Sequence, residues 1–201
     1  MVMRGKPGAA FGEPVRRRVA SGPHLPHQVW RSWRSTDAAA AAKAFFTRGR
    51  KAAVREGMEG LCSDDPFDHR CAAELARLVS RRKPGVLAEY GDLLAEVAAE
   101  FPAVEWQARG YALVAAALNA MSPAQRQRLL PLVRARLAED RIAVRAMALE
   151  AFATLAAQEP DLRDEAMEML EEHRHSADPA MRARARMMLP GLMRSEGPPR
   201  R

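Results

Sequence analysis

Apolar residues recur every three or four positions along most of the chain, which is the period of an amphipathic helix. Between 66 and 81, for example, Phe67, Cys71, Leu75 and Leu78 follow this spacing. Short breaks that contain Pro, Gly or Asp separate the periodic segments, and no alternation typical of strands competes with them. The pattern therefore predicts an all-α fold made of consecutive short helices.

These breaks also place the individual helices. The predicted helices span 38–47, 51–62, 66–81, 86–100, 102–119, a segment from Pro123 to Leu137, 141–157, 162–174 and 179–193. Four of them follow an aspartate, namely Asp37, Asp65, Asp140 and Asp178. Because a carboxylate accepts hydrogen bonds from the first free amides of a helix, we interpret these aspartates as N-caps.

Part of the pattern repeats along the chain. The segments 65–70, 140–145 and 178–182 each combine an Asp cap, a following Arg and an Ala-rich run. A fourth copy near 101–109 has an ambiguous register, because either Val104-Glu105 or Ala108-Arg109 fits the motif. With Arg109, the motif arginines are Arg70, Arg109, Arg145 and Arg182, at spacings of 39, 36 and 37 residues. This period predicts stacked helix pairs that share one continuous core.

The repeated motif, Asp-(Pro)-x-x-Val/Met-Arg-x-x-Ala, resembles the HEAT-repeat family over about 63–194, best at 140–155 and 178–189. The resemblance is closest to small bacterial HEAT-repeat proteins, for which no activity is established. It implies an α-α superhelix, a HEAT-like solenoid, of about four antiparallel helix pairs. In that family the second helix of each pair lines a concave face, which here implies 66–81, 102–119, 141–157 and 179–193.

The formal charge of +7 is unevenly distributed. Residues 1–55 hold 12 Lys and Arg against 2 acids, residues 56–181 hold 14 against 22, and residues 182–201 hold 6 against 1. These parts therefore carry +10, −8 and +5. We predict a flexible basic tail at 1–36 that contains Pro and Gly, a HEAT-like repeat domain at 37–194 and a basic C-terminal tail at 195–201. Because most of the excess charge lies outside the repeats, a pI near 10.2 is weak evidence for a nucleic-acid partner.

One tryptophan and four arginines are the candidate binding residues. Trp106 is the only tryptophan in the predicted repeats. Arg109 and Arg145 belong to the motif, while Arg182 and Arg186 lie four residues apart on one helix face and Arg184 points elsewhere. Guanidinium groups in such a pair suit phosphate or an acidic partner. The alternative is that the arginines near the C-terminus form a solvated end of the stack.

A structural role is predicted for a second group of charged residues. Asp65, Arg70, Asp140 and Asp178, together with Arg145, are expected to be helix caps and to form ion pairs between repeats. The alternative is that Asp65/Arg70 and Asp140/Arg145 form a charge ladder that binds a ligand. A metal site is not expected, because His69 and Cys71 are two residues apart on a helix and diverge.

Three hypotheses for the function follow. The first is a non-enzymatic scaffold that binds a protein or peptide with its concave face or its C-terminal edge. The second is a nucleic-acid-binding protein that acts through its basic termini. The third, a DNA-repair glycosylase of a HEAT-like class, is weaker because Trp106 and Glu105 diverge on a helix. The sequence carries no phosphate loop, HExxH or nucleophile elbow, so we expect no cofactor. With no long apolar segment, we expect a cytoplasmic protein without a membrane partner.

Overall fold

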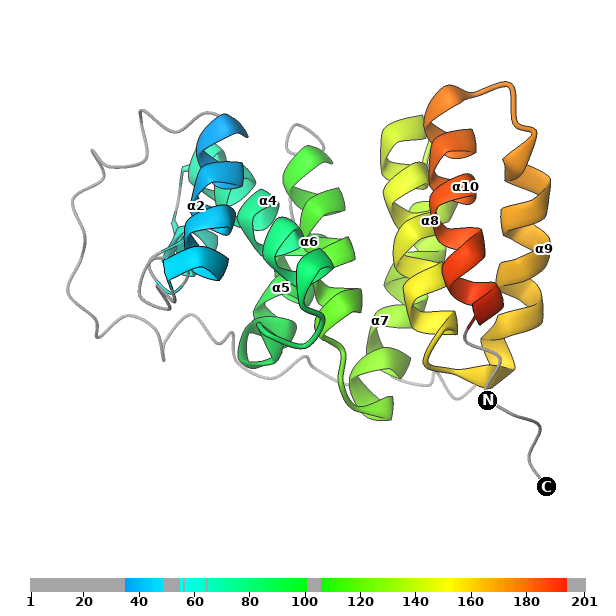
Figure 1. The fold of residues 1–201 in the computed structure, drawn as a ribbon, viewed down its shortest axis with the longest axis horizontal. Coiled ribbons are helices and arrows are strands. Elements are labelled where there is room, and N and C mark those ends of the chain that lie inside the picture. The colour runs from blue at the N-terminus through cyan, green and yellow to red at the C-terminus, as the bar shows by residue number, and fades with distance from the viewer. Residues whose placement is uncertain (1–34, 49–54, 56, 64, 101–105, 195–201) are drawn as a thin grey trace, which may run out of the picture.

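The computed structural model describes residues 35–48, 55, 57–63, 65–100 and 106–194. Within these ranges the regular structure is entirely helical, as the sequence predicts (Figure 1). The C-terminal tail at 195–201 and most of the N-terminal tail lie outside the described residues. So do residues 51–54 and 56 of the predicted helix 51–62, and residues 101–105 at the start of the ambiguous motif copy.

The helices follow the predicted order closely. The α-helices are α2 (Ser35–Arg48), α4 (Pro66–Arg82), α5 (Gly91–Glu100), α6 (Trp106–Asn119), α7 (Pro123–Leu137), α8 (Ile142–Ala156), α9 (Arg163–Arg174) and α10 (Pro179–Arg194). Three short 3-10 helices accompany them, namely η1 (Gly60–Cys62), η2 (Ala88–Tyr90) and η4 (Pro160–Leu162). Prolines at the first position of α4, α7 and α10 fit these starts, because the first helical amides have no partner within the helix.

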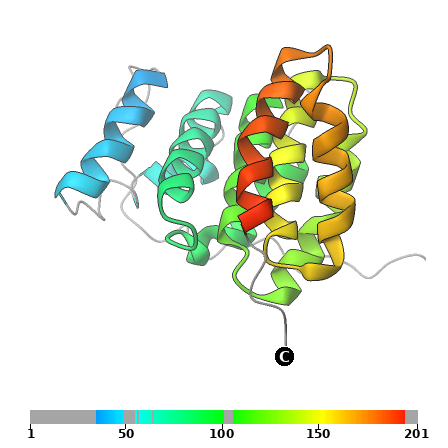
Figure 2. The ribbon, with the colours of Figure 1, turned by 45° about the vertical axis from the view of Figure 1, so that its right-hand side comes forward.

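The helices form two rows. In the central row, α2, α4, α6, α8 and α10 pack one against the next in chain order (Figures 1 and 2). In the flanking row, α5, α7 and α9 pack against α6, α8 and α10, to which short connections join them. Each such pair is antiparallel, because its two helices lie side by side and are joined by a short connection.

The core runs between the two rows. It is built largely of alanine and leucine, with Phe152 of α8 fully buried. Small residues bring the central helices close together, and Gly110 of α6 is the clearest case. A Cβ atom added at Gly110 would overlap the Sδ atom of Met147 on α8. This close packing lets long side chains on one helix of the central row reach helices beyond its neighbour.

Two of the predicted caps are present. The Asp65 carboxylate accepts a hydrogen bond from the amide of Phe67 at 2.8 Å. The Asp178 carboxylate accepts from the amides of Ala180 and Met181 at 2.8 and 3.0 Å. Each of these contacts satisfies backbone donors that the helix itself cannot pair.

The other two predicted caps are wrong. Asp37 lies inside α2, which already begins at Ser35, another residue that suits a helix start. At α8 the N-cap is Arg141, whose carbonyl oxygen accepts from the amides of Val144 and Arg145 at 2.9 and 3.1 Å. Asp140 is therefore one residue too early to cap, and its side chain is exposed.

The predicted helix 86–100 begins later than expected, at Gly91. Its first part is held by hydrogen bonds to the end of α6. The amide of Gly85 donates to the carbonyl oxygen of Leu118 at 3.0 Å, and the amide of Leu87 donates to Oδ1 of Asn119 at 2.8 Å. The φ of 77° at Gly85 is one that glycine adopts without strain. Tertiary contacts thus replace a helical turn that the apolar spacing predicts.

Candidate functional site

A buried carboxylate lies in the middle of the central row. Glu150 interrupts an otherwise apolar stretch of α8, and its side chain is only 4% exposed. An isolated buried carboxylate is strongly unfavourable, so its partners decide whether it can remain charged. Glu150 obtains two arginine partners from two other helices.

Arg81 of α4 and Arg184 of α10 are these partners. The Nε of Arg81 donates to Oε1 of Glu150 at 2.7 Å, and its Nη2 donates to Oε2, so the pair is bidentate. The Nη1 of Arg184 lies 3.1 Å from Oε2. A bidentate guanidinium–carboxylate pair fixes both distance and orientation. Both arginines are about one-quarter exposed, so each still presents part of its side chain to the surface.

The bridge from Arg81 to Glu150 passes over α6, because α4 and α8 are separated by that helix in the row. Packed helices lie about 8–10 Å apart, so a flat row would place α4 and α8 about 16–20 Å apart. The pair therefore joins two helices that are not neighbours in the row.

Arg77 lies one turn before Arg81 on α4 and is nine-tenths buried. Its guanidinium carbon lies 4.6 Å from the centre of the Tyr111 ring on α6, a cation–π contact. Its Nη2 is 3.9 Å from the Glu74 carboxylate, too long for a hydrogen bond. Its buried Nε has no hydrogen-bond partner in the described part of the chain. We call Glu74, Arg77, Arg81, Tyr111, Glu150 and Arg184 the Glu150 cluster.

The electrostatics of the cluster favour an added anion. Burial lowers the pKa of Arg77, and the positive charge of Arg81 lowers it further. Tyr111, Glu150 and Glu74 act in the opposite direction without cancelling the decrease. The cluster contains three arginines against two glutamates, so the cationic groups are incompletely compensated.

The structure places the arginines near the C-terminus in different surroundings. The Nη1 of Arg182 donates to the carbonyl oxygens of Ser176 and Ala177 at 2.6 and 3.3 Å, so this residue ties the loop before α10. Arg186 is exposed on α10 beside Pro190 and Met193. The residue that sequence reasoning set aside, Arg184, is the one that joins the cluster.

Among the described residues, Asp65 is not paired with Arg70, and Asp140 is not paired with Arg145. The Nη1 of Arg70 instead donates to Oε1 of Gln107 at 3.4 Å, a contact between α4 and α6. This contact joins α4 to α6 at a position two residues before Arg109.

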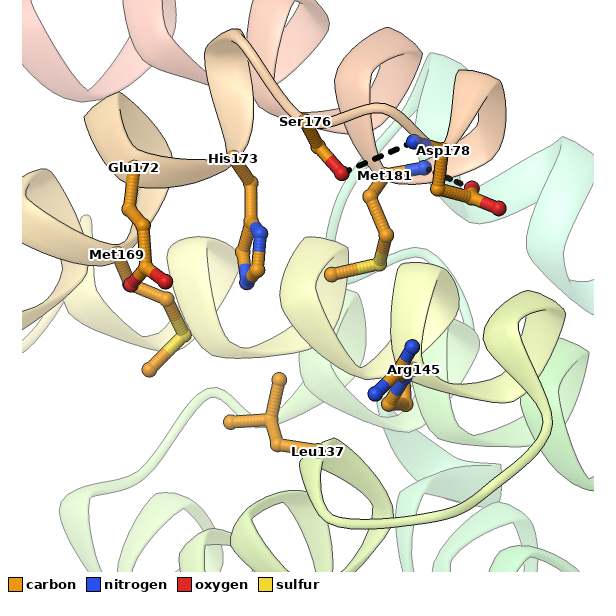
Figure 3. Close-up of a pocket in the computed structure, with 8 residues that line it drawn as sticks. All are labelled: Leu137, Arg145, Met169, Glu172, His173, Ser176, Asp178 and Met181. Carbon is orange, nitrogen blue, oxygen red and sulfur yellow. Dashed lines mark hydrogen bonds between the residues drawn. The ribbon is translucent and has the colours of Figure 1, made fainter.

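Arg109, Arg145 and Trp106 lie in different surroundings. Arg109 pairs with Glu139 at 3.2 Å, whereas Arg145 lines a pocket between the last two helix pairs (Figure 3). Trp106 is half-buried in the first turn of α6, and Glu105 lies outside the described residues. The structure therefore does not bring the predicted binding residues together into one site.

Sequence reasoning missed Glu150, Arg77 and Arg81. One signal was available, because Glu150 is the only charged residue between Arg145 and Glu159. A lone acid inside an apolar helical stretch indicates a buried charge with partners elsewhere in the fold. Its partners were not identifiable, since Arg81 lies 69 residues away in the chain.

Within the described ranges, His, Cys, Asp and Glu side chains form no group of three or more that could hold a metal ion. Cys71 is buried and Cys62 is exposed. None of the described helices is both long and apolar enough to cross a membrane. No protein-family model matches the chain, and searches of curated proteins and of solved structures find no match either.

Proposed function

We propose that this chain is a HEAT-like helical-repeat scaffold that binds an acidic segment of a partner protein along its central row of helices. The observation that carries the proposal is the buried guanidinium of Arg77, which lies on Tyr111 without a hydrogen-bond partner for its Nε. A carboxylate at this position would add the negative charge that the cluster lacks.

The geometry of the cluster supports this choice of ligand. Arg81 and Arg184 are fixed by Glu150, so they lose little side-chain entropy when a ligand binds. Tyr111 offers an aromatic surface beside them, and aromatic and arginine side chains are enriched at the energetically important positions of interfaces. An acidic segment with interspersed apolar residues fits both features.

Binding of a labelled peptide to the full chain tests the proposal. The probe is a fluorescein-labelled peptide of alternating glutamate and leucine, compared with the same peptide carrying glutamine. We expect the glutamate peptide to bind at least about tenfold more tightly, because charge-assisted hydrogen bonds are about twice as strong as neutral ones. Its affinity should fall as salt is raised.

Two variants localise the binding. The double change Arg77→Gln and Arg81→Gln should weaken the glutamate peptide about tenfold or more. Arg128→Gln is the matched control, because Arg128 has an acidic partner but lies 66% exposed on α7. Equal binding of both peptides, or equal weakening by both variants, would refute the proposal. Circular dichroism confirms that each variant is folded.

The competing hypothesis, nucleic-acid binding through the basic termini, gives a different result in the same assay. The two basic tails lie largely outside the described residues. Single-stranded DNA should then compete with the glutamate peptide, and a chain without 1–34 should lose DNA binding while it retains the peptide. DNA binding that depends on Arg77 and excludes the peptide would favour a phosphate ligand on the cluster instead.

A further inference from the structure

At two corresponding places along the stack, an arginine of a central helix lies against the loop of the next helix pair. We call these places junctions, and they differ by one charge. In the first, Arg109 of α6 lies against the loop between α7 and α8. There Glu139 accepts from the Nη1 of Arg109 at 3.2 Å and from the Nη1 of Arg136 at 2.6 Å. Burial lowers the pKa of Arg109, the charge of Arg136 adds to this, and Glu139 opposes both. The carboxylate of Glu139 thus compensates two arginines.

The second junction lies one helix pair later, at corresponding positions of the chain. Arg145 of α8 occupies the place of Arg109, 36 residues on, and its partner loop joins α9 to α10. Ser176 lies 37 residues after Glu139, and His173 lies 37 residues after Arg136. The short hydroxyl of Ser176 replaces the carboxylate. Among the described residues the Arg145 guanidinium has neither an ion-pair nor a hydrogen-bond partner, and its Nε is fully buried.

A pocket of about 220 Å³ opens at this place. Figure 3 shows its lining side chains gathered around a common space, with Arg145 on one side. Three apolar side chains contribute to the lining, from Leu137 of α7, Met169 of α9 and Met181 of α10. The pocket therefore combines a guanidinium that has no ion-pair partner in the described ranges with an apolar wall.

Two acidic residues also line the pocket, and neither forms an ion pair with Arg145 among the described residues. The carboxylate of Asp178 accepts hydrogen bonds from the amides of Ala180 and Met181 at the start of α10. Glu172 is exposed, and in Figure 3 it lies with Met169 on the side away from Arg145. The position that Glu139 fills in the first junction is not filled by either residue in the second.

We propose that the Arg145 pocket binds a carboxylate carried on a short aliphatic chain. The carboxylate takes the place that Glu139 takes beside Arg109, and the chain contacts Leu137, Met169 and Met181. Two sources share this chemistry, namely a glutamate side chain of a partner protein and a free small carboxylate. The pocket is separate from the Glu150 cluster, so this inference does not rest on the proposed function.

Methyl NMR of the full chain, with labelled methionine methyl groups, provides a direct readout at Met169 and Met181. The probes are butyrate, N-acetylglutamate amide and butyramide, the last as a neutral control. Butyrate and the glutamate derivative should shift the two methyl signals in a saturable manner, while butyramide should not. Saturation by butyrate alone identifies a free carboxylate as the ligand, whereas tighter binding of the glutamate derivative identifies a partner side chain.

The first junction, where Glu139 pairs with Arg109, suggests the most informative variant. Ser176→Glu places the missing carboxylate in the pocket, so it should abolish butyrate binding and raise the Tm by a few degrees. Ser176→Gln has nearly the same size without the charge, and it should leave the Tm lower than that of Ser176→Glu. Arg145→Gln should weaken binding about tenfold or more, in line with the loss of a charge-assisted hydrogen bond.

The reciprocal change tests the equivalence of the two junctions. Glu139→Ser should lower the Tm, because Arg109 and Arg136 lose the carboxylate that accepts from both, whereas Ser176→Glu should raise it. The inference is overturned if Met169 and Met181 do not respond to butyrate, or if Ser176→Glu and Ser176→Gln weaken binding equally. Arg77→Gln with Arg81→Gln should leave this binding unchanged, which separates a failure here from a failure of the proposed function.

Discussion

The ion pairs of Glu150 in the central row and the pair of Arg128 and Asp92 in the flanking row differ in burial. Glu150 on α8 is 4% exposed and contacts arginines on α4 and α10. In the flanking row, Arg128 of α7 and Asp92 of α5 form a 3.1 Å pair whose members are 66% and 60% exposed. Exposed pairs contribute about 0–1 kcal/mol, whereas breaking a buried pair leaves a charge without a partner.

This difference indicates distinct roles for the two rows. The exposed pair of Arg128 and Asp92 joins two neighbouring flanking helices, where water can replace either partner. The carboxylate of Glu150 instead fixes two arginines on one face of the molecule. A buried ion pair is weak evidence for stability on its own, because an apolar replacement often stabilises as well. The central cluster therefore fits a role in orienting arginines better than a role in folding.

The largest expected effect follows from removing the charge of Glu150. Glu150→Gln keeps the size of the side chain but leaves Arg81 and Arg184 without a carboxylate. We expect a loss of about 3 kcal/mol in the free energy of unfolding, the lower end of the range for broken buried pairs, because both arginines are partly exposed. Urea unfolding followed by circular dichroism measures it.

A triple variant separates folding from binding. Arg81→Met, Arg184→Met and Glu150→Leu together remove all three charges and should restore most of the stability lost in Glu150→Gln. The same variant should bind the glutamate peptide at least about tenfold more weakly than the native chain. If instead the triple variant is as unstable as Glu150→Gln, the cluster contributes to folding and the contrast between the rows is wrong.

The helices were predictable because their signals are local. Apolar spacing and the prolines at Pro66, Pro123 and Pro179 define where α4, α7 and α10 begin, and these starts agree with the structure. The segment before Gly91 was not predictable, since the side chain of Asn119, 32 residues after Leu87 in the chain, holds its backbone. Local periodicity carries no information on such a contact.

The candidate site was far less predictable than the helices. The repeat motif selected Arg145 and Arg182 as candidate residues, yet the buried cluster contains Arg77, Arg81 and Arg184. A repeat motif reports residues that recur, while the cluster depends on Glu150, which occurs in one copy only. The partners of a single buried charge follow from how the helices stack.

A buried hydrogen-bond network without charged groups tests whether burial alone explains the difference in stability between the buried and the exposed ion pairs. The Nδ2 of Asn119 donates to the Oγ of Ser80 at 2.6 Å and to the carbonyl oxygen of Ala115 at 2.7 Å, while its Oδ1 accepts from Leu87. Asn119→Ala should cost about 2 kcal/mol, because the Leu87 amide loses its partner. This loss should not change with salt, because none of the groups is charged, which urea unfolding at two salt concentrations checks.

The smallest effect is expected in the flanking row. Arg128→Gln should change the free energy of unfolding by about 0.5 kcal/mol or less, because both Arg128 and Asp92 are mostly solvated. The small loss should disappear at high salt, where exposed charges are screened. A cost near that of Glu150→Gln would mean that exposure does not govern the strength of these pairs. The ion pairs of the two rows would then contribute equally to the free energy of unfolding. Burial would give no reason to assign a ligand to the arginines of the central row.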